Sequence, residues 1–171
     1  MGKKFYYLWV SQILSQVTVN MMNFLLLAKI FEVTGSTIAT SLLWVSYALP
    51  TIFFGPIGAG IADLVSRRKT LLITNLLQSL VVFLYIFSHR YSVFLLFAVV
   101  TIYSFLNQFY VPAEGASLPS VVSKKNLVKA NSLFFLTQQL SLVIGFGFAG
   151  IIQKLVGFEG ALVICAVSLF I

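Results

Sequence analysis

The chain has 171 residues, of which 60% are hydrophobic and only 9% are charged, and its mean hydropathy is +1.02. A soluble domain of this size is far less apolar, so the composition predicts a polytopic membrane protein. The formal net charge of +7 would suit an acidic partner, but no basic tract with interleaved aromatic residues lies outside the apolar runs, and we expect no nucleic-acid partner.

Long apolar runs predict an all-α fold. A helix needs about 20 apolar residues to cross a hydrocarbon core about 30 Å thick. We expect helices near residues 5–31, 36–62, 70–87, 92–110 and 126–156, followed by a partial helix over 160–171. The last run spans only about 18 Å at 1.5 Å per residue, too short to cross a bilayer. We therefore expect either a piece of a longer protein or a natural truncation.

Basic residues are divided unequally between the two ends of these helices. If the N-terminus is cytoplasmic, the inner segments hold eight of them and the outer segments three. The inner set is Lys3, Lys4, Arg67, Arg68, Lys69, Lys124, Lys125 and Lys129, and the outer set is Lys29, Arg90 and Lys154. By the positive-inside rule this predicts a multi-pass protein of the plasma membrane with a cytoplasmic N-terminus.

The first predicted helix carries a stripe of amide side chains at spacings of four, four and three: Gln12, Gln16, Asn20 and Asn23. Amides within a bilayer are costly unless they meet protein partners or water. The stripe is explained by a polar cavity or by hydrogen bonds that hold helices together. We expect the cavity, because four amides exceed what one packing contact needs.

A charged connection joins the second and third predicted helices. Gly58 and Gly60 remove side-chain bulk near the end of the second helix, which permits close approach of another helix. Asp63 follows at the negative end of that helix, where a carboxylate is disfavoured. Three basic residues come next, Arg67, Arg68 and Lys69. The cluster is either an ordinary positive-inside loop with an incidental acid or a functional charge cluster.

The fourth predicted helix places aromatic and amide side chains on one face, with Tyr103, Asn107 and Tyr110 at spacings of four and three. Such a surface binds bulky amphiphilic molecules through apolar contact and a few hydrogen bonds. For Tyr110, a place in the aromatic belt at the inner interface is an alternative. Gln138 in the fifth predicted helix is a further cavity candidate.

The connection at residues 55–72 resembles the signature between the second and third helices of major facilitator superfamily transporters. Asp63 matches the acid of that signature, and Arg68 and Lys69 match its closing basic pair. Leu64 and Ser66 stand where the family usually has a basic residue and a glycine.

Residues 109–133 carry the most specific pattern in the chain. They resemble the inner loop between helices four and five in the macrolide-efflux and enterobactin-exporter branch of this superfamily. The pattern consists of Pro112, Ala113, Ala116, Leu118, Pro119, Val122, Leu127 and the run 130–133. The resemblance implies the N-terminal six-helix bundle of a twelve-helix protein, built as a 3+3 inverted repeat, with the missing C-terminal half as its partner. A weak internal echo that aligns Gly60 with Gly150 agrees with such a repeat.

The resemblance implies a secondary transporter that exports hydrophobic or amphiphilic compounds, such as drugs or macrolides, by alternating access. The alternative is a truncated or half-size membrane module without transport activity of its own. The residues implied as a conformational latch are Gly58, Gly60, Asp63, Arg67, Arg68 and Lys69. The cavity candidates are Gln12, Gln16, Asn20, Asn23, Tyr103, Asn107 and Gln138.

An enzymatic function has little support in the sequence. We find no nucleophile and base pair, no phosphate-binding loop and no metal-ligand cluster, and therefore expect neither an enzyme nor a cofactor. Proton antiporters usually carry a carboxylate within the membrane, but Glu32, Asp63, Glu114 and Glu159 are all expected at helix ends or in loops. On this interpretation, no proton carrier lies in this part of the protein.

Overall fold

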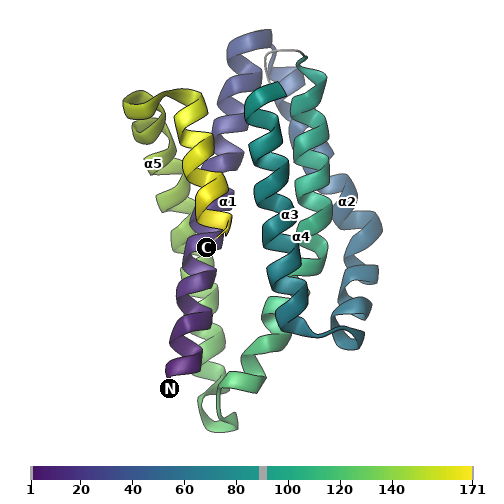
Figure 1. Cartoon of the computed structure of the whole chain (residues 1–171), viewed down its shortest axis with the longest axis vertical. Helices are drawn as coiled ribbons and strands as arrows, with labels where there is room; N and C mark the ends of the chain where they lie inside the picture. Colours follow the sequence, from purple (N-terminus) through teal and green to yellow (C-terminus); the bar gives the residue numbers. More distant parts are fainter. Residues whose placement is uncertain (1, 89–91, 171) are drawn as a thin grey trace.

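The computed structural model is all-helical, and it describes residues 2–88 and 92–170, apart from the side chains of Ala62 and Asp63. Five long helices and one short 3-10 helix follow one another along the described chain (Figure 1). They are α1 (Lys3–Thr34), α2 (Thr37–Leu64), α3 (Arg67–Ser88), α4 (Phe94–Val121), η1 (Lys124–Asn126) and α5 (Leu127–Phe170). Each long helix has the length and apolarity needed to cross a membrane, which confirms the predicted multi-pass helical class.

The α1–α2 connection is short because local caps end one helix and start the next. Gly35 takes a left-handed conformation with φ 60°, and its N–H donates to the Phe31 carbonyl at 2.8 Å. The Ser36 side chain then accepts a hydrogen bond from the Ala39 N–H at 3.2 Å. A glycine after one helix and a serine cap before the next are the usual signals for such a turn.

The helices pack in two main pairs, α1 with α5 and α2 with α4, and α3 packs against α4 and α5. The N-terminus, the α2–α3 connection and the α4–α5 connection all lie at one end of the bundle (Figure 1). We call this end the basic end, because eight of the basic residues lie there: Lys3, Lys4, Arg67, Arg68, Lys69, Lys124, Lys125 and Lys129.

The interior has two apolar clusters with a polar layer between them. The larger cluster lies toward the opposite end and includes Met22, Leu25 and Tyr103, whereas the smaller one, at the basic end, includes Phe5 and Phe134. Buried polar side chains lie between the clusters: Gln12, Ser15, Ser104, Gln108, Glu114, Thr137 and Ser141. Polar groups in a membrane protein interior mark interhelical contacts or functional sites.

The first stretch that resembles a family motif, residues 55–72, packs on α4 directly before the second stretch, residues 109–133. Pro112 has no N–H, so the carbonyl of Gln108, four residues earlier, loses its helical partner. A Cβ atom added to Gly58 would collide with that same carbonyl oxygen. Gly58 therefore lets the backbone of α2 lie directly on the backbone of α4. The predicted close approach at Gly58 is confirmed, and its partner lies within this chain.

A second close approach brings α5 against α1. A Cβ atom on Gly145 would lie 2.6 Å from Asn20 Cβ and 2.8 Å from the Val17 carbonyl oxygen. Not every glycine serves this purpose, since a Cβ atom on Gly60 or Gly147 would meet no atom within 4 Å. No described residue approaches either position, so the close helix packing predicted at Gly60 stays a prediction.

One predicted boundary needs correction. The fourth helix does not end at residue 110 but continues to Val121, through Pro112 and Pro119. In this segment α4 packs against α1 and α5 around Leu118, and this tertiary packing holds the helix together despite the two prolines. The break predicted between the helix over 126–156 and the partial helix over 160–171 is present at Gly157, which has φ 76° and ψ 173°, and the chain folds back there (Figure 1).

Candidate functional site

A polar pocket of about 220 Å³ opens between α1, α2, α4 and α5. We call it the amide pocket, because six of its ten lining residues carry carboxamides. Its lining consists of Gln16, Val19, Asn20, Asn23, Tyr47, Asn107, Val111, Gln138, Gln139 and Leu142. The structure thus brings together five of the seven residues predicted for a cavity, namely Gln16, Asn20, Asn23, Asn107 and Gln138.

Most of these carboxamides are available for a ligand. Asn20 donates to the Gln16 carbonyl of its own helix at 2.8 Å, and Asn107 donates to the Tyr47 hydroxyl at a long 3.4 Å. The side chains of Gln16, Asn23 and Gln138 form no hydrogen bond with any residue that the structure describes. Each carboxamide offers two donors and one acceptor, so the pocket can orient a ligand with polar groups of either type.

Apolar surface continues from the amide pocket. Asn23 and Tyr47 also line a small hollow whose other walls are Leu27, Leu43, Trp44 and Val100. Tyr47 packs edge-on against Trp44 with ring centroids 6.1 Å apart. A few polar groups beside aromatic and aliphatic walls form the usual surface for amphiphilic small molecules. Tyr47 is missing from the predicted cavity residues because it lies alone in an apolar run, without the repeated spacing seen in the amide stripe.

Two predicted cavity residues do not line this pocket. Gln12 is 3% exposed, and its amide donates to the Phe134 carbonyl of α5 at 3.2 Å. This is the interhelical hydrogen bond that was the alternative explanation for the stripe. Tyr103 is fully buried in the larger apolar cluster, and its hydroxyl has no hydrogen-bond partner among the described residues.

The residues predicted as a latch lie at the α2–α3 connection of the basic end. Arg67, Arg68 and Lys69 are exposed and form the first turn of α3, where positive charge is disfavoured by the helix dipole. The side chain of Asp63 lies outside the described part of the structure. The role of this cluster stays a prediction.

Glu114 overturns the expectation that every acid lies at a helix end or in a loop. It belongs to α4 and is only 5% exposed. Its Oε1 atom lies 3.1 Å from the hydroxyl of Tyr110, one turn earlier, and the same hydroxyl lies 3.1 Å from Ser15 Oγ on α1. Tyr110 is thus buried between helices and does not belong to an interfacial aromatic belt. Sequence reasoning missed this site because it ended the helix at residue 110.

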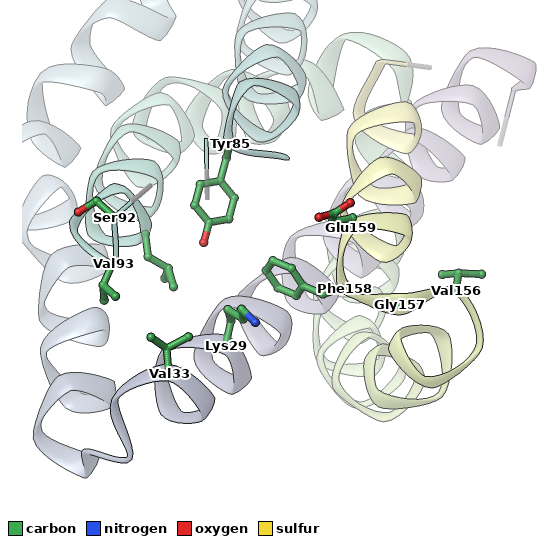
Figure 2. A pocket seen from close by; sticks show the side chains of 10 residues that line it. Lys29, Val33, Tyr85, Ser92, Val93, Val156, Gly157, Phe158 and Glu159 are labelled. Atoms are coloured by element: carbon green, nitrogen blue, oxygen red, sulfur yellow. The ribbon is translucent and has the colours of Figure 1, made fainter. Parts of the chain in front are cut away.

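A larger hollow of about 860 Å³ lies at the opposite end of the bundle, as Figure 2 shows. Its walls come from the ends of α1, α3 and α4 and from the kink of α5. Lys29 within it is already engaged, because its Nζ lies 3.2 Å from Glu32 Oε2 and 5.3 Å from the centre of the Phe158 ring. We therefore interpret it as a hollow between helix ends and take the amide pocket as the candidate site.

Five long apolar helices, four of which line a polar pocket, define a multi-pass membrane protein. Its sequence agrees with one family over almost its whole length, since the family model of the Major Facilitator Superfamily matches residues 8–171. The chain belongs to the major facilitator superfamily, which confirms the resemblance seen in the two motif regions.

Curated relatives come from the same superfamily. An uncharacterized MFS-type transporter of Bacillus subtilis, YjbB, is 28% identical over 99% of this chain and 43% of its own length. A second one, YkuC, is 29% identical over 77% of this chain and 31% of its own length. Macrolide efflux protein A of Streptococcus pyogenes is 26% identical over 82% of this chain and 36% of its own length. The chain thus spans less than half the length of these relatives. No solved structure matches it.

Proposed function

We propose that this chain is the N-terminal half of a secondary transporter that exports hydrophobic or amphiphilic compounds by alternating access. The single observation that carries the proposal is the amide pocket, where carboxamides from α1, α4 and α5 converge and most lack a partner among the described residues. A similarity to a protein named for macrolide efflux favours export and a bulky amphiphilic substrate.

The small size of the amide pocket supports a substrate site that is shared with a second helical bundle. Its volume of about 220 Å³ lies below the roughly 300–1,000 Å³ of pockets that enclose drug-sized ligands. Gln138 and Gln139 on its rim are exposed. We therefore propose that a second helical bundle closes the site from the other side. Family members place their substrate between two such bundles near the middle of the membrane.

The packing pattern supports an inverted repeat within this half. α2 lies against α4 at Gly58, and α5 lies against α1 at Gly145. In an inverted repeat of three helices, α1 corresponds to α4 and α2 corresponds to α5. The contact of α2 with α4 then corresponds to the contact of α5 with α1. The segment of α5 after Gly157 then corresponds to α3, as the start of a sixth transmembrane helix.

The distribution of basic residues supports a cytoplasmic N-terminus. Among the described residues, eight Lys and Arg lie at the basic end, whereas Lys29 and Lys154 lie toward the other. Such an excess marks the cytoplasmic side of the plasma membrane. Asp63, Arg67, Arg68 and Lys69 then face the cytoplasm, where we propose that they act as a latch against the second bundle in the outward-open state.

Efflux from membrane vesicles tests the proposed site. The full-length gene product would be assayed for transport of ethidium and erythromycin, with Asn20→Leu and Asn107→Leu as variants of the amide pocket. Thr101→Val is a matched control, because Thr101 is exposed and bonds only its own helix, at the Phe97 carbonyl. Losing one ligand hydrogen bond should raise KM roughly ten-fold. Equal KM values for all variants would exclude this pocket as the substrate site.

The latch is tested by Asp63→Asn. We expect this variant to insert normally and to lose export, because the conformational bias disappears while the helices stay intact. A normal export rate in vesicles with wild-type protein content would refute the latch.

A further inference from the structure

We propose that Glu114 is a proton-binding carboxyl group of this transporter, connected through Tyr110 to Ser15 on α1. The inference rests on the proposed transport function and adds to it a group that couples transport to protons. It is carried by the position of one buried acid in a contact between two helices.

The geometry defines a chain of three side chains. The Tyr110 hydroxyl lies 3.1 Å from Glu114 Oε1 and 3.1 Å from Ser15 Oγ. All three residues are buried, with Glu114 5%, Tyr110 4% and Ser15 4% exposed. A carboxylate has room for about four hydrogen bonds, but Tyr110 is the one described side chain that bonds to Glu114. An ionised carboxylate in such surroundings is costly, because burial without sufficient partners leaves its charge unbalanced.

Both protonation states fit the same contacts. When Glu114 is ionised, Ser15 donates to the Tyr110 oxygen and Tyr110 donates to the carboxylate. When the carboxylate takes up one proton from water, it becomes a neutral acid and donates to Tyr110, which then donates to Ser15. The hydroxyl hydrogens of Ser15 and Tyr110 rotate and reverse the direction of the chain, while every heavy atom keeps its place. No group other than the proton is gained or lost.

No described cation neutralises Glu114. The charged and titratable side chains of the packed elements at the basic end are Lys3, Lys4, Tyr6, Tyr7, Arg67, Arg68, Lys69, Lys124, Lys125 and Lys129, besides Asp63, whose side chain is not described. The ten described ones are exposed, and none of them forms an ion pair or a hydrogen bond with Glu114. The acid is thus held by a neutral phenol, an arrangement in which binding and release of a proton change the net charge of the interior.

A route for protons exists on the α1 side. Ser15 lines a hollow of about 170 Å³ together with Ser11 and Asn75, and Asn75 Oδ1 is buried without a partner among the described residues. A polar hollow of this size accommodates several water molecules. Water in it would reach Ser15 and, through Tyr110, the carboxyl group.

The same helix connects this carboxyl group to the amide pocket. Asn107 and Val111 of α4 line the amide pocket, and Glu114 lies one turn beyond Val111. Protonation favours the packed state in which α4 buries Glu114 against α1, and release of the proton favours its hydration and separation from α1. A movement of α4 therefore changes the substrate side chains and the carboxyl group together.

Transport measurements in proteoliposomes of the full-length protein test the inference. Glu114→Gln mimics the permanently protonated state and should lower ethidium accumulation driven by a pH gradient roughly ten-fold. Exchange of ethidium without a gradient should stay within about two-fold of wild type, since the substrate pocket is intact. Glu32→Gln is the matched control, because Glu32 is an exposed acid at the opposite end, and it should retain gradient-driven accumulation.

Four outcomes decide between the ideas. The inference would be overturned if Glu114→Gln accumulated as much ethidium under a pH gradient as wild type does. It would also be overturned if ethidium transport by wild type did not depend on the gradient. In both cases the proposed transport function would stand. If wild type moves no ethidium at all, the proposed function fails in this assay, and infrared pH titration of the carboxylic acid band decides the inference. A band that is present in wild type and lost in Glu114→Gln supports proton binding, and identical spectra overturn it.

If Glu114→Gln fails to insert into the membrane, Glu114→Asp and Tyr110→Phe take its place. Both variants must then change the pH dependence of the carboxylic acid band or of transport.

Discussion

Gly58→Ala tests the contact on which the packing of α2 against α4 depends. The added Cβ would collide with the Gln108 carbonyl oxygen and would lie 2.8 Å from its carbonyl carbon. These are backbone atoms, so no side-chain rotation relieves the overlap, and the two helices must move apart. Overpacking of this kind costs about 1–3 kcal/mol, and more when the backbone has to shift.

The matched control is Gly60→Ala on the same helix, where a Cβ meets nothing within 4 Å. An alanine in an open helical position gains up to about 1 kcal/mol over glycine. The two variants should therefore differ by roughly 2–4 kcal/mol, or on the order of 5 °C or more in Tm. The assay is thermal unfolding of the purified full-length protein in detergent, followed by fluorescence-detected size exclusion. Equal Tm values for the two variants would show that the helices do not approach at Gly58.

Three further predictions follow from the packing of α5. Gly145→Ala should destabilise the protein by roughly 2–4 kcal/mol relative to Gly147→Ala in the same assay, since a Cβ at 145 would lie 2.6 Å from Asn20 Cβ on α1 and one at 147 would be free. Ser79→Ala removes a 2.7 Å hydrogen bond to the α5 backbone and should cost about 0.6–2 kcal/mol, and a Tm equal to wild type would count against it. Gln12→Met should lower stability by less than about 1 kcal/mol and leave the KM for substrate unchanged, because one of its buried polar atoms already lacks a described partner. A KM shift as large as that of a pocket variant would place Gln12 in the site after all.

The amide stripe shows how far a periodic pattern reaches. Spacings of four, four and three correctly predicted polar side chains near one face of α1, and three of the four line the amide pocket. Successive positions four residues apart still differ by about 40° around a helix with 3.6 residues per turn. Gln12 therefore points to α5 and Gln16 to the pocket. The periodicity predicts which face of α1 is polar. The packing of α1 against α5 decides which amides of the stripe remain available to a ligand.

The sequence by itself determined the class of the protein. The signals are local and do not depend on contacts with other helices: the long apolar runs, the turn at Gly35 and Ser36, and the two family motifs. Only the tertiary structure decided that α4 continues through two prolines, that Tyr103 is core and that Glu114 is buried. The physical reason is that propensities act over a few residues, whereas packing of α1 and α5 around the end of α4 compensates for the lost backbone hydrogen bonds. The same packing buries a carboxyl group that, in a loop, would have been an ordinary surface acid.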